Sequence, residues 1–343
     1  MEEPIKHREE AAGLEYWLRW QVPVCALIIL LPFAVAIRIL RREEPPPPLL
    51  AFSATHLWLP CWKNLNPLWL LFFRAFAFAS MAFLLYHIVA LLRGLFAFYF
   101  YTQWTFALVT IYFALATFIS ARGCWIHSRK RFTDETMSSE FLKKSSKENE
   151  SDGTSFLNPE ETNHAIKSQS HHSKKANVHT VGFLEHLMQA IYQTCAGAVM
   201  LTDIVFWCLL VPFLLGDKFQ LTLLIGSIHS VNAVFLILDS VLNSQPLTWY
   251  GLPYFVIWSV SYVVFQWILH ACGFTWWPYP FLELSTPWAP LWYFALALVH
   301  LPCYGIYVLL VKAKVWTFSR IFPNAFLRPV NASSRNSMEK KQT

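Results

Sequence analysis

Residues 22–37 read VPVCALIILLPFAVAI, and Arg38 is the first charged residue that follows them. A helix that spans a bilayer needs about 20 mostly apolar residues, because each residue adds roughly 1.5 Å of length. The stretch therefore predicts a membrane-spanning helix at about residues 21–40. A polar segment rich in Glu precedes it without a small-residue cleavage site, so we expect an anchor that stays in the protein.

Six further apolar stretches of similar length follow. The composition agrees with them, because 55% of the residues are apolar, 17% are aromatic and only 14% are charged, whereas an ordinary soluble domain is about 25% charged. The sequence predicts an all-α integral membrane protein, with a six-span helical bundle plus one additional N-terminal span, seven in total. The further stretches lie at about 69–92, 102–121, 187–214, 219–241, 253–272 and 289–311.

The chain divides by composition into three parts. Residues 1–66 hold the first span and a Pro-rich linker, residues 67–312 hold the six-span bundle, and residues 313–343 form a basic tail. Within the second part, about 133–178 is polar and rich in Ser and in charges of both signs. Such a segment has too little apolar surface to fold alone, so we expect a disordered cytosolic loop there.

The sequence favours neither a cofactor nor a metal site. The seven Cys are scattered without a CxxC pair, so no zinc site or disulfide framework is indicated. A weak metal site at His171, His172 and His179 stays open as an alternative. The formal net charge of +6 is too small to indicate nucleic-acid binding. The partners that we expect are membrane lipids, and the sequence specifies no protein partner.

Basic residues set the expected orientation in the membrane. With seven spans, all but five of the 27 Lys and Arg fall on one side, and that side is normally the cytosol. We therefore expect the N-terminus outside or in the lumen and the C-terminus in the cytosol, in the plasma membrane or an endomembrane. The sequons at Asn149 and Asn331 would then lie on the cytosolic side and stay unglycosylated.

Three of the expected spans carry polar residues on one face. Polar groups in lipid are costly and usually face the interior of a bundle or a cavity. Positions seven apart, or within about 80° at 100° per residue, share a helix face. We therefore expect three helices to converge on a polar interior. The residues are Gln103, Thr110 and Thr117; Gln189, Gln193 and Asp203; and His229, Asn232 and Asp239.

Thr110 and His229 lie at similar expected depths, about 12 and 15 Å into their spans, and Asp203 falls in the same half of the bilayer. A hydroxyl nucleophile needs a base that takes its proton, and a His with an unperturbed pKa near 6.5 can do this. Asn232, one turn from His229, can orient the ring or donate to an oxyanion. The candidate catalytic residues are therefore Thr110 and His229, with Asn232 and Asp203 in support.

Each of these residues also has a structural interpretation. A Thr in a transmembrane helix most often donates to the carbonyl four residues earlier. Asp239 lies near a helix end, where it can be solvated. His270 and His300 are the other histidines at comparable positions, and His87 has no evident partner. The chain has no GxSxG and no HExxH motif, so a common soluble hydrolase or a zinc protease lacks support.

Four stretches resemble a known family. They are YTQW at 101–104 leading to Leu108-Val109-Thr110, Ile228-His229-Ser230-Val231-Asn232 running to Leu238-Asp239, the helix from Tyr262 to Gly273, and WPYPFLE at 277–283. Together they resemble the rolling stone proteins and, more distantly, the androgen-induced and androgen-dependent TFPI-regulating membrane proteins. The resemblance covers about residues 70–312, and the YPFLE stretch is its most specific element.

The resemblance implies a fold and an activity. The androgen-induced branch is similar to a six-span bundle with cytosolic termini. Its members look like intramembrane hydrolases of fatty acid esters of hydroxy fatty acids, with a Thr nucleophile and a His. By position these map onto Thr110 and His229, and two extra residues between Trp104 and Thr110 make Thr105 a competing candidate. The rolling stone branch, to which the chain looks closer, is linked to myoblast fusion.

Two functions therefore stand side by side. One is a Thr/His hydrolase of lipid esters, and the alternative is a non-enzymatic membrane protein in fusion, adhesion or scaffolding. A seven-span receptor or transporter is less favoured. In this chain the long loop follows the third expected span, and the sequence shows no internal repeat of the kind that transporters have.

Overall fold

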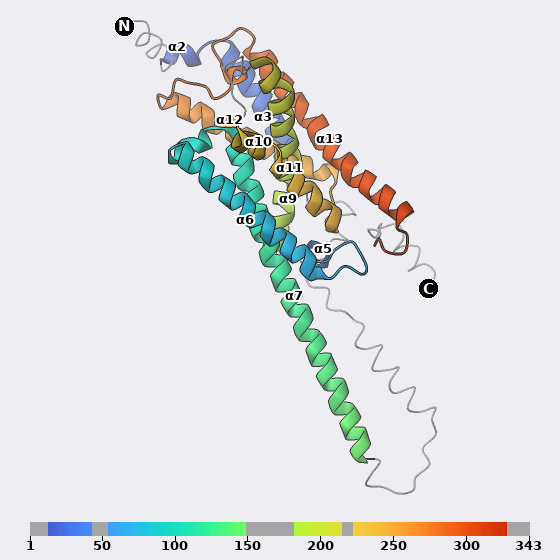
Figure 1. Ribbon diagram of the computed structural model, residues 1–343. Helices are drawn as coiled ribbons and strands as arrows, with labels where there is room; N and C mark the ends of the chain where they lie inside the picture. The colour runs from blue at the N-terminus through green and yellow to red at the C-terminus, as the bar shows by residue number, and fades with distance from the viewer. Residues whose placement is uncertain (1–12, 43–53, 149–181, 215–221, 328–343) are drawn as a thin grey trace, which may run out of the picture.

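The computed structural model describes residues 13–42, 54–148, 182–214 and 222–327, which form helices joined by loops (Figure 1). Within these ranges, seven helices are long and apolar enough to cross a membrane. The prediction of an all-α, seven-span membrane protein is confirmed. The residues His171, His172 and His179 and both sequons lie outside the described residues.

The spans form close to the expected stretches. They are α3 (Gln21–Leu40), α6 (Pro67–Leu91), the first part of α7 (Tyr101–Glu148), α9 (Phe183–Ile204) with its π-helical continuation η2 (Val205–Leu214), α10 (Leu223–Ile228) followed by α11 (Val231–Leu242), α12 (Leu252–Ala271) and α13 (Ala289–Ile321). Local chemistry fixes some starts. Pro67 occupies the first turn of α6, and the Asn66 side chain accepts a hydrogen bond from the Leu68 N–H at 3.0 Å.

Short helices mark the two ends of the bundle. One end carries α2 (Leu14–Trp17), η1 (Gly94–Tyr99) and η4 (Pro280–Leu282), and the other carries α5 (Thr55–Trp58) and η3 (Trp249–Gly251). Figure 1 shows α2 and α5 at opposite ends, so we name these the α2 end and the α5 end. Neither end is assigned to the cytosol, and the orientation stays a prediction.

Helix α9 lies at the centre of the bundle. It packs against α7, α12 and α13, and its side chains from Met188 to Thr202 are almost all buried. The first span, α3, packs against α12 and α13 through a face that includes the buried Cys25, Ile29 and Ala36. The additional span is therefore part of the bundle and does not stand apart from it.

The segment before α6 joins the bundle to the end of α13. The Cys61 N–H donates to Leu242 O at 2.9 Å, and Cys61 O accepts from the Leu327 N–H at 2.8 Å. Lys314 Nζ donates to Asn243 O at 2.7 Å.

Because α13 runs on to Ile321, the part expected as a tail from 313 begins as a helix. The Pro-rich linker falls mostly within residues 43–53, outside the described residues.

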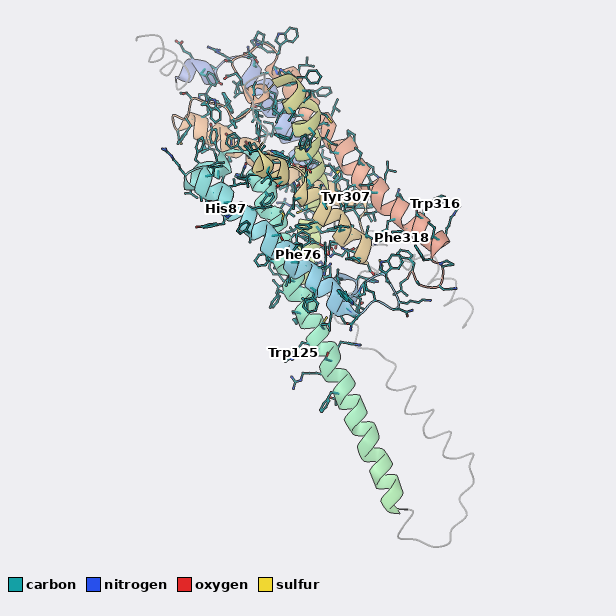
Figure 2. All side chains as sticks on the ribbon, in the orientation of Figure 1. Phe76, His87, Trp125, Tyr307, Trp316 and Phe318 are labelled. Atoms are coloured by element: carbon teal, nitrogen blue, oxygen red, sulfur yellow. The ribbon has the colours of Figure 1, made fainter. Side chains whose placement is uncertain are left out.

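Helix α7 continues well beyond the bundle. It runs to Glu148, and Figure 1 shows its second half projecting past the α5 end, with Trp125 labelled near the exit in Figure 2. The prediction of a disordered loop at about 133–178 is therefore wrong for residues 133–148, which are helical. Residues 149–181 lie outside the described residues. The physical reason is propensity: Glu, Lys, Leu and Met are strong helix formers, and a polar segment can extend a helix that is already nucleated.

Two spans depart from a regular α-helix near the α2 end. The fourth span changes to a π-helix at Val205, and Pro212 lies within it. The fifth span breaks between Ile228 and Val231, where His229 and Ser230 leave helical geometry. Breaks in a transmembrane helix are tolerated where neighbouring protein satisfies the backbone, and π-helical turns are frequent at functional sites.

A buried ion pair joins α6 to α11. Arg74 Nε donates to Asp239 Oδ1 at 2.7 Å, and both side chains are 0% exposed. Arg74 also donates to Ser120 Oγ at 2.8 Å and to Leu57 O at 2.5 Å. The sequence suggested a solvated Asp239, and the structure shows that this is wrong. A charge at this depth persists because it is paired and fully hydrogen-bonded.

Tyr112 and Asn243 complete the shell of Asp239. The Tyr112 hydroxyl donates to Asp239 Oδ2 at 2.5 Å, and Asn243 Nδ2 donates to the same oxygen at 2.7 Å. Gln245 Nε2 in turn donates to the Tyr112 hydroxyl at 3.1 Å. One carboxylate therefore connects α6, α7, α11 and the loop that follows α11.

Removing the carboxylate charge should destabilise the bundle strongly. We expect Asp239→Asn to lower the free energy of unfolding by about 3–5 kcal/mol, because it leaves a buried guanidinium without a counter-ion. The measurement is equilibrium unfolding of the purified protein in mixed detergent micelles.

The Arg122–Glu185 pair supplies the control: Glu185 is only 4% exposed, but the Arg122 side chain is 46% exposed, so the guanidinium that Glu185→Gln leaves without a counter-ion stays hydrated. We expect Glu185→Gln to cost less than about 1 kcal/mol. Equal losses from the two substitutions would contradict the central role of the Arg74–Asp239 pair.

Candidate functional site

A cavity of about 90 Å³ lies between α7, α9, α12 and α13 near the α2 end. Most of its wall is apolar, which suits it to an acyl chain. Small-molecule sites are typically apolar hollows with a few placed polar groups. The polar side chains in the wall are Tyr101, Thr102, Thr202, Ser259, Tyr262, Tyr279 and His300.

The Tyr112–Asp239 hydrogen bond sets the relative depth of α7 and α11. Both spans run from the α2 end to the α5 end. Thr102 lies ten residues before Tyr112, and His229 lies ten residues before Asp239. At about 1.5 Å per residue, both lie roughly 15 Å from this shared hydrogen bond. Thr102 and His229 are therefore at similar depth.

Thr110 lies elsewhere. It is two residues from Tyr112, so it is roughly 12 Å nearer the α5 end than His229. Its hydroxyl donates to Phe106 O at 2.9 Å, the usual bond of a helical Thr, and it lines neither cavity of the bundle. The expected match in depth between Thr110 and His229 does not hold.

That expectation failed because hydropathy placed the start of the fifth span at about 219, whereas its helix begins at Leu223 and breaks at His229. Thr105, the competing candidate, is fully buried and is likewise not part of either cavity wall. Of these three threonines in α7, Thr102 lines the 90 Å³ cavity, whereas Thr105 and Thr110 line neither this cavity nor the 80 Å³ cavity between α3, α12 and α13.

His229 lies at the break between α10 and α11 and is 6% exposed. Its ring stacks on Phe206 of η2 at a centroid distance of 3.6 Å and an interplanar angle of 1°. The Trp207 indole donates to the His229 carbonyl at 2.9 Å, which satisfies the broken backbone. Among the described residues, His229 Nδ1 has no hydrogen-bond partner.

Asp203 and Asn232, which we expected to support His229, contact each other instead. Asn232 Nδ2 donates to Asp203 Oδ1 at 3.4 Å, while Asn232 Oδ1 accepts from the Ala233 N–H at 2.9 Å. The amide is thus engaged away from His229. The neighbouring Thr202 hydroxyl lies 3.3 Å from Asp203 Oδ1 and lines the cavity. The cluster therefore extends from the cavity wall at Thr202 to Asn232, which lies three residues after His229.

Sequence reasoning missed the polar pair Tyr101–Ser259. The two hydroxyl oxygens are 2.8 Å apart, and both residues are buried in the cavity wall. Tyr101 belongs to the YTQW stretch that carried the resemblance, but a lone Ser in α12 has no pattern that marks it. His87, which had no evident partner, is exposed on α6 (Figure 2) and makes an edge-to-face contact with Phe83 at a centroid distance of 4.3 Å.

The YPFLE stretch closes the cavity at the α2 end. Tyr279, Phe281 and Leu282 line it. The Tyr279 phenol interacts with Thr102, and burial raises the pKa of this phenol. Tyr279 therefore stays protonated at neutral pH and can donate a hydrogen bond toward the cavity.

In the ranges that the structure describes, no group of three or more His, Cys, Asp or Glu side chains could hold a metal ion. Comparisons of this chain with protein-family models, with curated proteins and with solved structures find no match. The resemblance to the rolling stone and androgen-induced proteins therefore stays a prediction.

Two serines of α12 allow a matched test of the cavity wall. We expect Ser259→Ala to lower the free energy of unfolding by about 1–3 kcal/mol, because the buried Tyr101 hydroxyl loses its partner. Ser261 donates to Ile257 O on the exposed side of the same helix, so Ser261→Ala should change stability by less than about 0.5 kcal/mol. Unfolding in detergent micelles measures both, and a larger loss for Ser261→Ala would contradict this wall.

Proposed function

We propose that this multi-pass membrane protein hydrolyses lipid esters, such as fatty acid esters of hydroxy fatty acids, within the bilayer. The observation that supports the proposal is that the Thr102 hydroxyl lines an apolar cavity at the depth of the buried His229, although the His229 side chain lines neither this cavity nor the one beside it. The resemblance implies the same two residue types. The proposal moves the nucleophile from Thr110 to Thr102 and keeps His229 as the base.

The chemistry follows the general pattern of nucleophilic catalysis. Thr102 Oγ attacks the ester carbonyl carbon while His229 takes the hydroxyl proton. When the tetrahedral intermediate collapses, the bond to the alcohol oxygen breaks, and His229 returns the proton to that oxygen. A water molecule then attacks the acyl-threonine, again with His229 as base, and releases the fatty acid and the free Thr102 hydroxyl.

Other side chains of the cavity have supporting roles in this proposal. In this proposal the Tyr279 phenol, which interacts with Thr102, donates to the oxyanion. Asn232 donates to Asp203, and the Thr202 hydroxyl lies 3.3 Å from the same carboxylate, so we assign these residues a supporting role beside the helix break. The apolar remainder of the wall accommodates acyl chains and excludes bulk water.

Threonine substitutions in α7 test the assignment. We expect Thr102→Val, which keeps the side-chain shape, to abolish hydrolysis of a long-chain fatty acid ester. His229→Gln should lower the rate by about 10²–10⁴-fold, the range for loss of a general base. Hydrolysis by protein in native membranes, with release of free fatty acid as the readout, measures both.

Thr110→Val is the matched control, because its hydroxyl only donates to Phe106 O in the same helix. It should keep hydrolysis near the wild-type rate. Loss of activity in Thr110→Val but not in Thr102→Val would overturn the choice of nucleophile. A folded wild-type protein that hydrolyses no lipid ester would favour the non-enzymatic alternative.

A further inference from the structure

The histidine near the end of α12 lines neither cavity and has no part in the proposed chemistry. His270 is only 2% exposed, although α12 ends at the next residue. Its Nδ1 lies 2.9 Å from Phe274 O, and because a carbonyl oxygen can only accept, Nδ1 carries a proton. In the neutral ring Nε2 is then an acceptor, and it has no hydrogen-bond partner among the described residues.

Aromatic rings cover His270. The Trp277 ring stacks on the imidazole at a centroid distance of 4.4 Å and an interplanar angle of 24°. The Tyr16 ring of α2 packs against the imidazole at 4.9 Å, and the Trp17 ring lies at 6.0 Å. Tyr16 and Trp277 are themselves buried. Water therefore reaches His270 Nε2 only if one of these rings moves.

The Glu283 carboxylate joins α2 to the YPFLE stretch beside this ring. The Tyr16 hydroxyl donates to Glu283 Oε1 at 2.9 Å, and the Ser285 N–H donates to the same oxygen at 3.0 Å. Burial and the Glu283 carboxylate raise the pKa of the Tyr16 phenol. Tyr16 therefore stays protonated and remains a donor, and α2 is held to the bundle by this hydrogen bond and by the packing of its rings.

Two titratable side chains face His270 from the described elements packed around it. The Tyr16 phenol lies on α2, and the Glu283 carboxylate, which acts electrostatically on the ring, follows η4. The other titratable groups in this region are hydrogen-bonded elsewhere or exposed. They are the Tyr293 phenol of α13, which donates to Leu282 O, and the exposed Glu15 and Arg19 of α2.

A second proton can enter the ring only at Nε2, because Nδ1 already carries one. The imidazolium then presents a charged N–H donor to aromatic rings, and a buried charge is costly unless it gains a partner. The carboxylate that acts on the ring is Glu283, which is bonded to Tyr16. A hydrogen bond between two opposite charges is stronger than one from a neutral phenol. The imidazolium therefore competes with Tyr16, and the covering Tyr16 ring has to move.

We propose that His270 is a pH-sensitive switch at the α2 end. When Nε2 takes up a proton, the imidazolium draws Glu283 away from Tyr16, and α2 is released from the YPFLE stretch. That stretch supplies three residues of the 90 Å³ cavity wall, so the switch controls how firmly this end of the cavity is closed. The proposal does not depend on the hydrolase, because the docking of α2 is its readout.

The setting suits such a switch. We expect the N-terminus, and with it the α2 end, outside the cell or in a lumen, where the pH varies between compartments. An ordinary imidazole changes its charge between about pH 5 and about pH 8. Histidines that gain a proton in acidic compartments change protein interfaces in this way.

Hydrogen–deuterium exchange of the protein in lipid nanodiscs tests the switch. Peptides that cover α2 and Ser285 are compared at about pH 7.5 and about pH 5.5, on either side of the ordinary imidazole pKa. Exchange times are scaled for the pH dependence of intrinsic exchange, and peptides of α9 serve as the reference. We expect the corrected exchange of α2 to rise about tenfold at the lower pH, as for the loss of one hydrogen bond to a charged group.

His270→Asn separates the proton from the packing. The Asn amide can still donate to Phe274 O but does not titrate, so α2 should stay docked at both pH values. His87→Asn is the matched control, because His87 is exposed on α6, and it should keep the wild-type response. Tyr16→Phe removes the hydroxyl that holds Glu283, so its α2 should exchange rapidly at both pH values.

Equal corrected exchange of α2 at the two pH values in the wild-type protein would overturn the switch. The imidazolium would then be held in place, for example by the face of Trp277. A wild-type response in a folded His270→Asn protein would also overturn it, because another group would then carry the proton. The comparison of the wild-type protein at two pH values needs no variant to fold.

Discussion

A single buried carboxylate holds this bundle in register. Asp239 receives hydrogen bonds from Arg74 of α6, Tyr112 of α7 and Asn243 after α11. Charges inside a membrane bundle persist only when they are paired, because the unpaired state is costly. Helices that share such a partner cannot slide past each other by a turn without losing it. The depth of every other side chain on α7 and α11 follows from this bond.

The candidate site follows from that register. Counting ten residues back from each partner of the Tyr112–Asp239 bond leads to Thr102 on one helix and His229 on the other. In the same region two spans depart from regular α-helical geometry, with a π-helix from Val205 and a break at His229. The polar network at one end of the bundle is thus the rigid base, and the irregular end carries the cavity.

Sequence patterns predicted the spans well, because the length of an apolar stretch is a direct requirement of the bilayer. They also indicated that Asp203 and Asn232 belong to one polar cluster. They failed on depth, because the limits of an apolar stretch do not locate helix starts within a turn, and Thr110 was chosen from such limits. Nothing in the sequence around Arg74 distinguishes it from a charge that flanks a span. Its burial could be recognised only once the structure placed Asp239 beside it. The packing of α3 and the Tyr101–Ser259 pair depend on contacts between distant segments, which one sequence does not reveal.

We propose Thr102 as the reactive hydroxyl of a membrane-embedded hydrolase. The most direct measurement treats the protein in native membranes with a long-chain fluorophosphonate and locates the adduct by fragmentation mass spectrometry. Fragment ions between residues 102, 105 and 110 distinguish the three hydroxyls. The account predicts the adduct on Thr102 and its loss in His229→Gln, because the base no longer activates the hydroxyl. An adduct on Thr110 or Thr105, or none in a folded wild-type protein, would contradict it.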